Sequence, residues 1–423
     1  MKPEYFDDLI TLCSEISEQE NKLLPLCAAE NIISPFSKIP LDTFLQEKYI
    51  MGGVMEYQNH SNFVGSKKLY DIYKLLTCQC NKLFNCKYAD ARTLSGVNAV
   101  MTLLMSLFSA GDTILISPEE CGGHGSMPKI CHRLGINTID MPYNYEIFDF
   151  DYLQINSIIK EKKIDGILIC LSDIITMPQL YNINLPEDCI LIFDATQILG
   201  LIASNNIDNP FKWFNEKQKF ILMGATHKTL PGPTCGLIMT NNLNLAAIFD
   251  TLINPDYLRN SQLHHILSLI LALMELEVYG GQYGKAIINN ANKLAHTLAE
   301  YDFKILKAQQ QYTYTHQIFI SMIKEEAQKF YNKCLEYGVS INVRNKQLYK
   351  TCGLRIGTQE ISRYGWQNEE MTTIAKILRD IRDSNLVFTN ISNEINKLCS
   401  NKKLYFTFEN EYYDILYSKL HNR

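Results

Sequence analysis

Two patterns of apolar residues alternate along the middle of the chain. Short, nearly continuous apolar runs, typical of buried strands, are followed by stretches with apolar residues at helical spacing, such as 98–108 and 151–163. The runs cover 89–94, 112–117, 136–142, 165–172, 189–196, 219–226 and 235–241. Because buried strands separated by helices form parallel sheets covered on both faces, we predict one large α/β domain with a mostly parallel, seven-stranded sheet.

The pattern differs towards both ends of the chain. Residues 1–45 interleave acidic and apolar positions at helical spacing, which predicts a helical N-terminal arm. After Gly280-Gly281-Gln-Tyr-Gly284 come a helical stretch, several short apolar runs and closing helices, typical of a smaller α+β domain on an antiparallel sheet. We therefore predict an arm over 1–45, a large domain over 46–280 and a small domain over 281–423.

Composition and charge exclude several classes of protein. Of the 423 residues, 46% are apolar and 20% are charged, which is the balance of a globular protein with sizeable cores. The net charge is −5 and no basic block is present, so nucleic-acid binding has no support. The longest apolar run, 266–274, is shorter than the ~18 residues that indicate a membrane span.

The chain contains thirteen cysteines. Its first twenty residues lack the basic and apolar regions of a secretory signal, so we expect reduced thiols in a cytoplasmic protein. Cys78, Cys80 and Cys86 cluster without the paired C-x-x-C spacing of zinc modules, and no metal site is predicted.

Polar residues end several of the apolar runs. In open parallel sheets ligands bind at the carboxyl ends of the strands, so these residues are candidates for a site. They are Ser95-Gly96, Ser172, Asp194, and Lys228 with its neighbours Thr226 and His227.

Lys228 and Asp194 have the clearest chemistry among these candidates. Lys228 precedes the segment TLPGPTCG, which stops any helix and could hold the amine desolvated as a nucleophile; the alternative is a solvated loop lysine. Asp194 follows the apolar strand CILIF, and a buried acid needs a cation such as a protonated pyridine nitrogen; the alternative is a cap of the next turn. Ser95-Gly96 opens a helix and could bind a phosphate, or form an ordinary N-cap.

In this order, and together with Gly122-Gly123-His124, these motifs resemble the serine hydroxymethyltransferase family of fold-type I pyridoxal phosphate enzymes. The resemblance covers nearly the whole chain. It rests on CAAENIISP, LFNCKYADARTLSG, LIFDATQILGLIA, ATHKTLPGPTCGLI and CGLRIGTQEISRYGW.

The resemblance implies pyridoxal 5'-phosphate as cofactor and a role for each matching residue. Lys228 would bind the cofactor covalently, Asp194 would pair with its ring nitrogen, and His124 would stack on its ring. The cofactor pocket would also include Ser95, Gly96, Val97, Ser172, Gln197, Thr226 and Arg259. Arg355 would bind the substrate carboxylate, with Glu30 and Ala29 nearby. Tyr49 would reach into the partner's site, which implies a homodimer.

The departures from the family lie mostly at the folate end of the site. Met51 stands where the family has a glutamate that handles protons, and a thioether cannot titrate. Ala29 replaces a serine that touches the substrate hydroxyl, and Thr234 replaces a basic residue. The paired tyrosines near the folate fall at Asn62-Phe63, and the loop that helps to hold the pterin is shortened to RNKQLYK.

Three further departures concern the cofactor cradle. Val97 replaces a phosphate-binding serine, and Gln197 replaces a histidine. Arg259 lies in a loop that is glycine-rich in the family, where backbone N–H groups reach the partner's phosphate; its charge could replace those donors.

We therefore predict an enzyme that makes or breaks the Cα–Cβ bond of a β-hydroxy α-amino acid without folate, with an amino acid and an aldehyde as partners. It would resemble the threonine transaldolases related to the family. His124, His227, Glu56 and His60 are the candidates for the base that the reaction needs. The alternatives are a divergent serine hydroxymethyltransferase, a non-catalytic paralogue, and racemisation or decarboxylation from the same carbanion.

Overall fold

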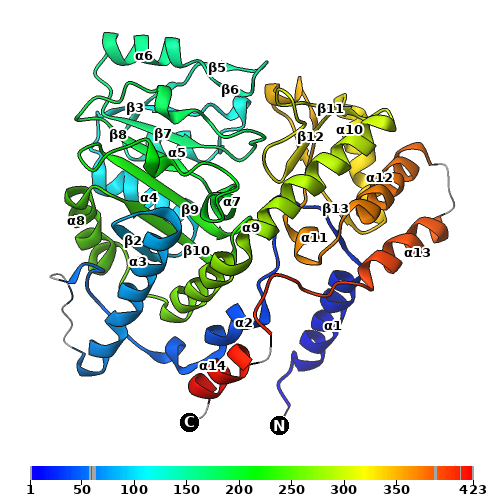
Figure 1. Cartoon of the computed structure of the whole chain (residues 1–423), viewed down its shortest axis with the longest axis horizontal. Coiled ribbons are helices and arrows are strands. Elements are labelled where there is room, and N and C mark those ends of the chain that lie inside the picture. The colour runs from blue at the N-terminus through cyan, green and yellow to red at the C-terminus, as the bar shows by residue number, and fades with distance from the viewer. Residues whose placement is uncertain (1, 57–58, 60–62, 385–387, 410, 422–423) are drawn as a thin grey trace. The chain divides into compact units, whose positions relative to one another are not determined.

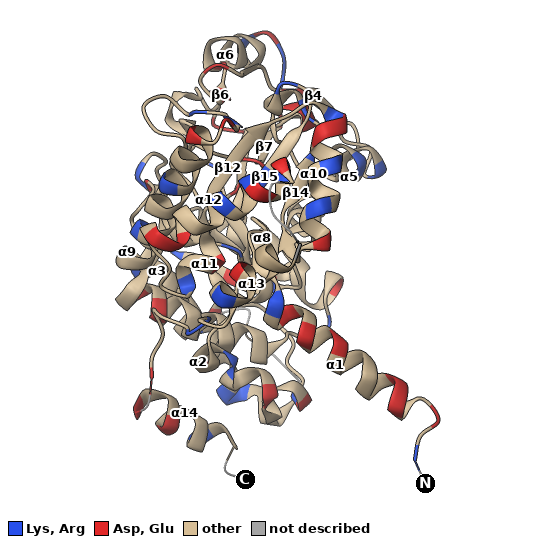
Figure 2. Ribbon diagram, turned by 90° about the vertical axis from the view of Figure 1, so that its right-hand side faces the viewer, with Lys and Arg blue, Asp and Glu red and all other residues tan. Residues whose placement is uncertain are grey.

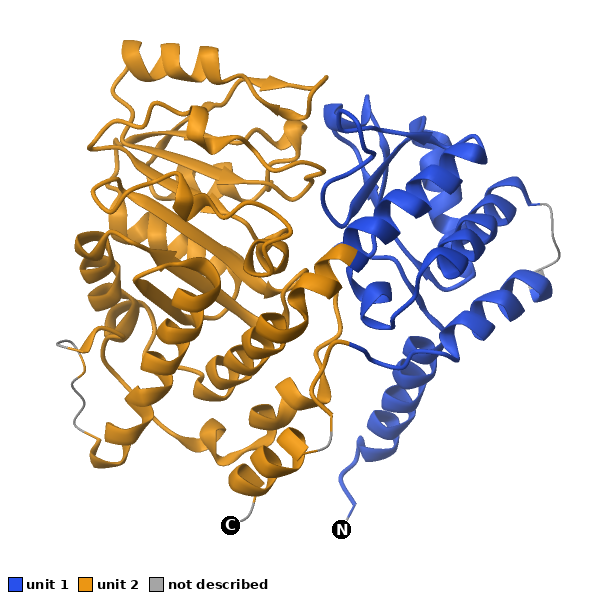
Figure 3. Ribbon diagram, in the orientation of Figure 1, with its two compact units in different colours: residues 1–28, 286–405 blue, residues 29–285, 406–423 orange. Residues whose placement is uncertain are grey.

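The structure, a computed structural model, describes residues 2–56, 59, 63–384, 388–409 and 411–421. The chain forms two compact units (Figure 3). Unit 1 consists of residues 1–28 and 286–405, and unit 2 of residues 29–285 and 406–423. The sequence analysis instead divided the chain into an arm and two domains, with breaks near residues 45 and 280. The arm is thus shared between the two units, and the C-terminal tail belongs to unit 2.

A seven-stranded sheet forms the centre of unit 2 (Figure 1). Its order is β2-β10-β9-β8-β7-β3-β4, and only β10 runs antiparallel to its neighbours. The strands are β2 (Tyr88–Thr93), β3 (Thr113–Ile116), β4 (Asn137–Asp140), β7 (Gly166–Cys170), β8 (Ile190–Asp194), β9 (Phe220–His227) and β10 (Pro231–Thr240). Each of the seven apolar runs in the sequence forms one of these strands. The prediction of a mostly parallel seven-stranded sheet is therefore confirmed.

Helices and short elements connect these strands. The helices of unit 2 are α2 (Pro35–Lys38), α3 (Tyr70–Phe84), α4 (Gly96–Leu107), α5 (Met127–Arg133), α6 (Tyr152–Glu161), α7 (Leu199–Ala203), α8 (Leu243–Thr251) and α14 (Glu411–His421). Short turns of helix are η1 (Ile39–Asp42), η2 (Phe44–Glu47), η4 (Val64–Leu69), η5 (Glu119–Cys121), η6 (Leu180–Asn182), η7 (Pro210–Lys212) and η8 (Leu252–Tyr257). A small antiparallel ribbon joins β5 (Tyr143–Asn144) to β6 (Asp149–Phe150).

The long helix α9 (Leu263–Glu300) runs through the glycine cluster that the sequence analysis treated as a break. A Cβ at Gly280 would lie 2.8 Å from Ser204 Cβ, and one at Gly284 would lie 2.2 Å from Asn206 Nδ2. These glycines therefore let the helix backbone approach the turn after α7, and they do not end the helix. By length and composition α9 could also span a membrane, but 61% of its most apolar window is buried within the protein.

Unit 1 is built on a four-stranded antiparallel sheet of order β11-β12-β15-β14. This agrees with the expected α+β character of the C-terminal part. The strands are β11 (Lys304–Ile305), β12 (Gln317–Ser321), β14 (Asn342–Arg344) and β15 (Gly353–Gly357). The other elements are α10 (Lys324–Glu336), η9 (Gln347–Tyr349), α11 (Gln359–Arg363), α12 (Asn368–Asp383) and α13 (Phe388–Cys399). From the N-terminal segment, β1 (Leu24–Pro25) pairs in parallel with β13 (Val339–Ser340).

The first helix, α1 (Phe6–Lys22), buries none of its residues in this chain. Its apolar side chains Phe6, Leu9, Ile10, Leu12 and Ile16 are between 43% and 53% exposed. Acidic residues mark much of the rest of the helix (Figure 2). An amphipathic helix with an uncovered apolar stripe has a face suited to a protein partner.

The C-terminal tail packs on unit 2 through aromatic contacts. The ring of Phe408 lies 5.1 Å from that of Phe36 and 5.4 Å from that of Tyr279. Thr407 donates its hydroxyl to the buried carboxylate of Glu275 in α9. These contacts explain why residues 406–423 belong to unit 2 and not to the small domain in which we predicted them.

Candidate active site

Three segments of unit 2 meet at one edge of the large sheet. β8 ends at Asp194, β9 ends just before Lys228, and α4 begins at Gly96 after β2. β8 and β9 are parallel neighbours, so their carboxyl ends lie at the same edge. A Cβ at Gly96 would lie 3.0 Å from Ala225 Cβ and 3.4 Å from Thr196 Oγ1, which places the start of α4 against both strand ends. The predicted site residues on these segments are therefore brought together.

Asp194 is a buried carboxylate surrounded by neutral donors. Its Oδ1 accepts from the Thr196 N–H at 2.9 Å, and its Oδ2 accepts from the Cys170 thiol at 3.0 Å. Within the described part of the chain, no lysine, arginine or histidine forms an ion pair with it. A carboxylate kept buried in this way is suited to a cationic group supplied by a ligand.

Hydrogen bonds fix the backbone at Lys228 and at the residue that follows it. Asn31 Nδ2 donates to the carbonyl of Lys228 and also to the hydroxyl of Tyr283, at 2.9 Å. The hydroxyl of the next residue, Thr229, donates to the Gln197 carbonyl at 2.9 Å and accepts from the Gly200 N–H at 3.2 Å. A lysine on so constrained a backbone can present its amine in a defined position.

Asn31 and Cys170 were not among the predicted site residues. Asn31 lies in the quoted motif CAAENIISP, so the motif offered a signal for it. Cys170 had no sequence signal, because its contact with Asp194 depends on the pairing of β7 with β8.

His124 and Ser172 are brought together by the Gly122-Gly123 turn. The Gly122 carbonyl accepts from the Ser172 N–H at 2.8 Å, and the His124 N–H donates to the Cys170 carbonyl at 2.9 Å. A Cβ at Gly123 would lie 2.3 Å from the Ser117 carbonyl oxygen, so only glycine fits here. His124 Nδ1 accepts from the Ser126 N–H at 3.2 Å, which holds the ring against the turn.

The start of α4 has the geometry of an N-cap. The Ser95 hydroxyl accepts from the Asn98 N–H at 3.2 Å. Gly96 and Val97 follow as the first helical residues, whose N–H groups have no acceptor within the helix. Such a helix start favours an anion.

Two predicted cofactor residues have contacts of a structural kind. Thr226 is fully buried, and its hydroxyl donates to the Pro233 carbonyl inside the β9–β10 hairpin. Gln197 is 3% exposed, and its carbonyl accepts from Thr229.

His227 lines a cavity of about 510 Å³. The other lining residues are Ala29, Glu30, Asn31, Ile33, Leu41, Gly232, Pro233, Thr234 and His265. Burial, helped by the charge of Lys228, lowers the pKa of His227 to about 4, so its imidazole is neutral near pH 7. The predicted substrate residues Ala29 and Glu30 thus share a cavity with His227.

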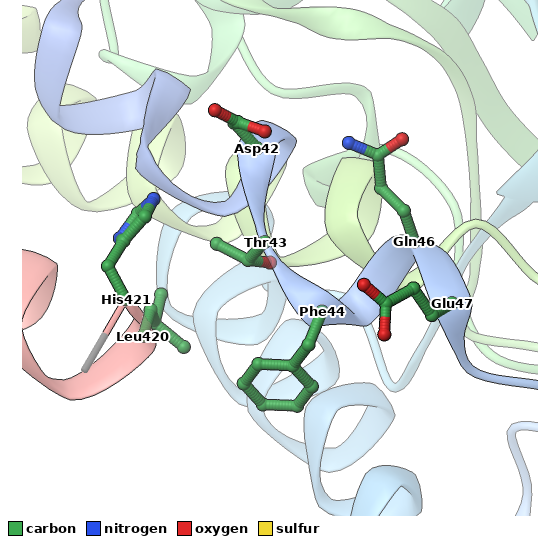
Figure 4. A pocket seen from close by; sticks show the side chains of 7 residues that line it. All are labelled: Asp42, Thr43, Phe44, Gln46, Glu47, Leu420 and His421. Carbon is green, nitrogen blue, oxygen red and sulfur yellow. The ribbon is translucent and has the colours of Figure 1, made fainter. Parts of the chain in front are cut away.

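A second cavity, of about 400 Å³, lies beside the C-terminal helix (Figure 4). Its lining residues are Asp42, Thr43, Phe44, Gln46, Glu47, Leu420 and His421. None of the predicted site residues lines it, so it is separate from the candidate site.

The remaining predicted residues lie on an exposed segment of unit 2 and in unit 1. Tyr49 is 40% exposed, and its ring lies 4.8 Å from that of Phe63. Arg259 is exposed, and its carbonyl accepts from Asn254 Nδ2. Arg355 belongs to β15 of unit 1, where it is 2% exposed and donates to Asn342 Oδ1 at 3.1 Å. Asn62, which departs from the family, and His60, a candidate base, lie outside the described residues.

Comparison with known proteins shows similarity along nearly the whole chain. The family model for serine hydroxymethyltransferase matches residues 4–378. A serine hydroxymethyltransferase from Picrophilus torridus is 30% identical over 404 residues, covering 90% of this chain and 89% of that protein. One from Sulfolobus acidocaldarius is 27% identical and covers 90% of both chains.

The fold also matches that of a solved structure. The crystal structure of L-threonine transaldolase from Pseudomonas fluorescens, in its internal aldimine state, superposes with a TM-score of 0.89. The match covers 98% of this chain and 97% of that one at 20% sequence identity. At this identity the match establishes the fold.

Proposed function

Because the chain belongs to the serine hydroxymethyltransferase family, we propose that it makes or breaks the Cα–Cβ bond of a β-hydroxy α-amino acid without folate. It is a pyridoxal phosphate-dependent enzyme of the aldol type. The proposal adds the class of substrate and the independence from folate.

The residues at the sheet edge fit the cofactor. Asp194 offers a buried carboxylate that no cation of the described residues pairs with, as a protonated ring nitrogen requires. We assign the covalent link to Lys228 and the ring face to His124. We propose that Ser95, Gly96 and Val97 bind the phosphate. The remaining pocket residues are Ser172, Gln197, Thr226 and Arg259. When bound, pyridoxal phosphate supplies an electron sink for the carbanion left at Cα.

The observation that carries the proposal is the thioether at Met51. The peptide unit between Met51 and Gly52 is held by two hydrogen bonds. The Met51 carbonyl accepts from the Tyr70 hydroxyl, and the Gly52 N–H donates to Asn254. A methionine cannot exchange the protons that a glutamate exchanges during folate chemistry. Thr234 and Ala29, which line the same cavity as His227, stand in place of two further polar groups of the family's site.

Cleavage of the bond needs a base for the β-hydroxyl. Glu56 is a poor candidate, because it forms an ion pair with Lys74 at 3.2 Å and its side chain is 83% exposed. Among the described residues His124 and His227 remain. The lowered pKa of His227 keeps its ring neutral and able to accept a proton, whereas Nδ1 of His124 already accepts from the Ser126 N–H. Arg355 would hold the substrate carboxylate in a bidentate contact.

We further propose a cytoplasmic homodimer. Tyr49 lies on an exposed segment, as a residue that serves a partner's site must. The uncovered apolar stripe of α1 offers a surface for a second copy. None of the thirteen cysteines, which all lie among the described residues, is paired in a disulfide, and a reducing compartment is compatible with this.

The test follows aldehyde release from a β-hydroxy amino acid in the absence of folate. We expect release by the wild type and none by Lys228→Ala. A wild type that is silent with every β-hydroxy amino acid unless tetrahydrofolate is added would favour the second candidate, an ordinary serine hydroxymethyltransferase. The names of the relatives support that candidate.

A further inference from the structure

The segment that carries Tyr49 and Met51 is held by side chains of the segment 250–260. We propose that Asn260 is a positioning residue that fixes Tyr49 for its role in the active site. This inference rests on the proposed function, in which Tyr49 serves that site.

Three side-chain oxygens accept from alternate backbone N–H groups of the Tyr49 segment. Ile50 N–H donates to Asn260 Oδ1 at 3.0 Å, and Gly52 N–H donates to Asn254 Oδ1 at 2.9 Å. Val54 N–H donates to Asp250 Oδ1 at 2.7 Å. Gly52 has a φ of 105°, so the segment bends at this residue, and the three oxygens satisfy N–H groups before, at and after the bend.

We call the three contacts of Ile50, Gly52 and Val54 with Asn260, Asn254 and Asp250 the ladder. The side chains of the segment that it holds differ in their exposure. Ile50, Gly52 and Val54, whose N–H groups are bound, are buried. Tyr49, just before Ile50, is exposed, and Met51, between Ile50 and Gly52, is half-buried. Gly53 is buried as well, so burial does not alternate strictly along the segment. The direction of Tyr49 is fixed by the bonds to the peptide units on its two sides.

Asn260 makes the most specific contact of the three. Its Nδ2 donates to the Lys48 carbonyl at 3.0 Å while its Oδ1 accepts from Ile50, so one amide binds both sides of Tyr49. The peptide units that flank Tyr49 cannot rotate without breaking one of these bonds.

The other end of the ladder is anchored in the interior. Asp250 pairs with Arg92, and both side chains are fully buried. Arg92 Nη1 also donates to the Gly52 carbonyl at 2.8 Å. With this end fixed, the contact of Asn260 at the exposed end decides where Tyr49 lies.

The ladder also joins the Tyr49 segment to the loop of Arg259. Asn254 accepts from Gly52 and donates to the Arg259 carbonyl at 3.0 Å. The residue proposed to contact a phosphate and the tyrosine are therefore held by one network.

The experiment compares Asn260→Ala with a matched control, Asn156→Ala. Asn156 makes the same two-sided contact elsewhere, donating to the Asn182 carbonyl and accepting from the Asn184 N–H, both at 2.9 Å. It lies in α6, outside the proposed site. We expect Asn260→Ala to lower kcat/KM for the β-hydroxy amino acid by about 10- to 100-fold, and Asn156→Ala to change it less than twofold. The thermal midpoint and the absorbance of bound cofactor should change equally in both variants.

A double-mutant cycle with Tyr49→Phe separates positioning from general support. If Asn260 acts through Tyr49, its removal in the Tyr49→Phe background should cost much less than in the wild type. Asn260→Asp keeps the acceptor for Ile50 but loses the donor to Lys48, so it should be intermediate; it also serves if the alanine variant does not fold.

Equal losses in both backgrounds, or a loss no larger than that of Asn156→Ala, would overturn the inference. The proposed function is judged separately, on the wild type. If only serine with tetrahydrofolate is turned over, that proposal fails, and the same cycle is run with serine to decide the role of Asn260.

Discussion

At the scale of single residues, the site combines a rigid frame with unusual side chains. Asn31 and Thr229 fix the backbone at Lys228 and just after it, and Asp194 accepts hydrogen bonds from neutral donors. Met51 and Ala29 lack the polar groups that folate chemistry uses. Under the proposed function the retained residues serve carbanion chemistry at Cα, and the altered ones stand where the family has groups that act further out on the substrate.

The half-buried His227, next to Lys228, gives a prediction on pH and stability. Its pKa is about 4 in the folded protein and 6.5 as the ordinary value, so between these values the unfolded chain binds a proton that the folded chain does not. Stability should therefore fall as the pH is lowered from 6.5 to 4. Between these two pH values the free energy of unfolding of His227→Gln should decrease less than that of the wild type, by on the order of 2 kcal/mol.

Urea unfolding at several pH values measures this effect. His264, whose pKa burial also lowers, remains in both proteins, so only the difference between the two curves counts. Parallel curves for wild type and variant would show that His227 is not neutralised by burial.

At the scale of elements, the sequence pattern predicted strands better than it predicted the ends of domains. The seven runs form the seven strands, and the central ones, such as β7 and β8, are buried along their whole length. The glycines of 280–284 looked like a break, since the close approach of α9 to Ser204 and Asn206 is a tertiary contact that no local pattern shows. The ladder of Asn260, Asn254 and Asp250 and the contact of Cys170 with Asp194 were missed for the same reason. The order of motifs, by contrast, was sufficient to place Lys228, Asp194 and Ser95 at one edge.

The two kinds of glycine in α9 can be separated by experiment. Gly284→Ala places a methyl group where Asn206 and Ser204 lie, and should destabilise the protein by about 1–3 kcal/mol. Gly281→Ala meets nothing within 4 Å and should stabilise it by about 0.5–1 kcal/mol, because alanine favours the helix. Chemical unfolding measures both; equal effects of the two variants would mean that the glycines do not serve packing.

At the scale of the whole molecule, two units and an exposed amphipathic helix suggest an assembly of two chains. The paired variant Leu9→Asp/Ile16→Asp should shift the protein from dimer to monomer in sedimentation velocity, because charge replaces the apolar stripe of α1. Glu15→Gln and Glu18→Gln, on the same helix, serve as controls that should stay dimeric. A wild type that sediments as a monomer would contradict the proposed homodimer.

The central claim is that Cα–Cβ chemistry here needs no folate, and one measurement tests it most directly. The initial rate of aldehyde release from a β-hydroxy amino acid is followed while tetrahydrofolate is titrated from zero to saturation. The account predicts a rate that is already maximal without tetrahydrofolate and does not change along the titration. A rate that starts at zero and saturates with tetrahydrofolate, for serine alone, would contradict it.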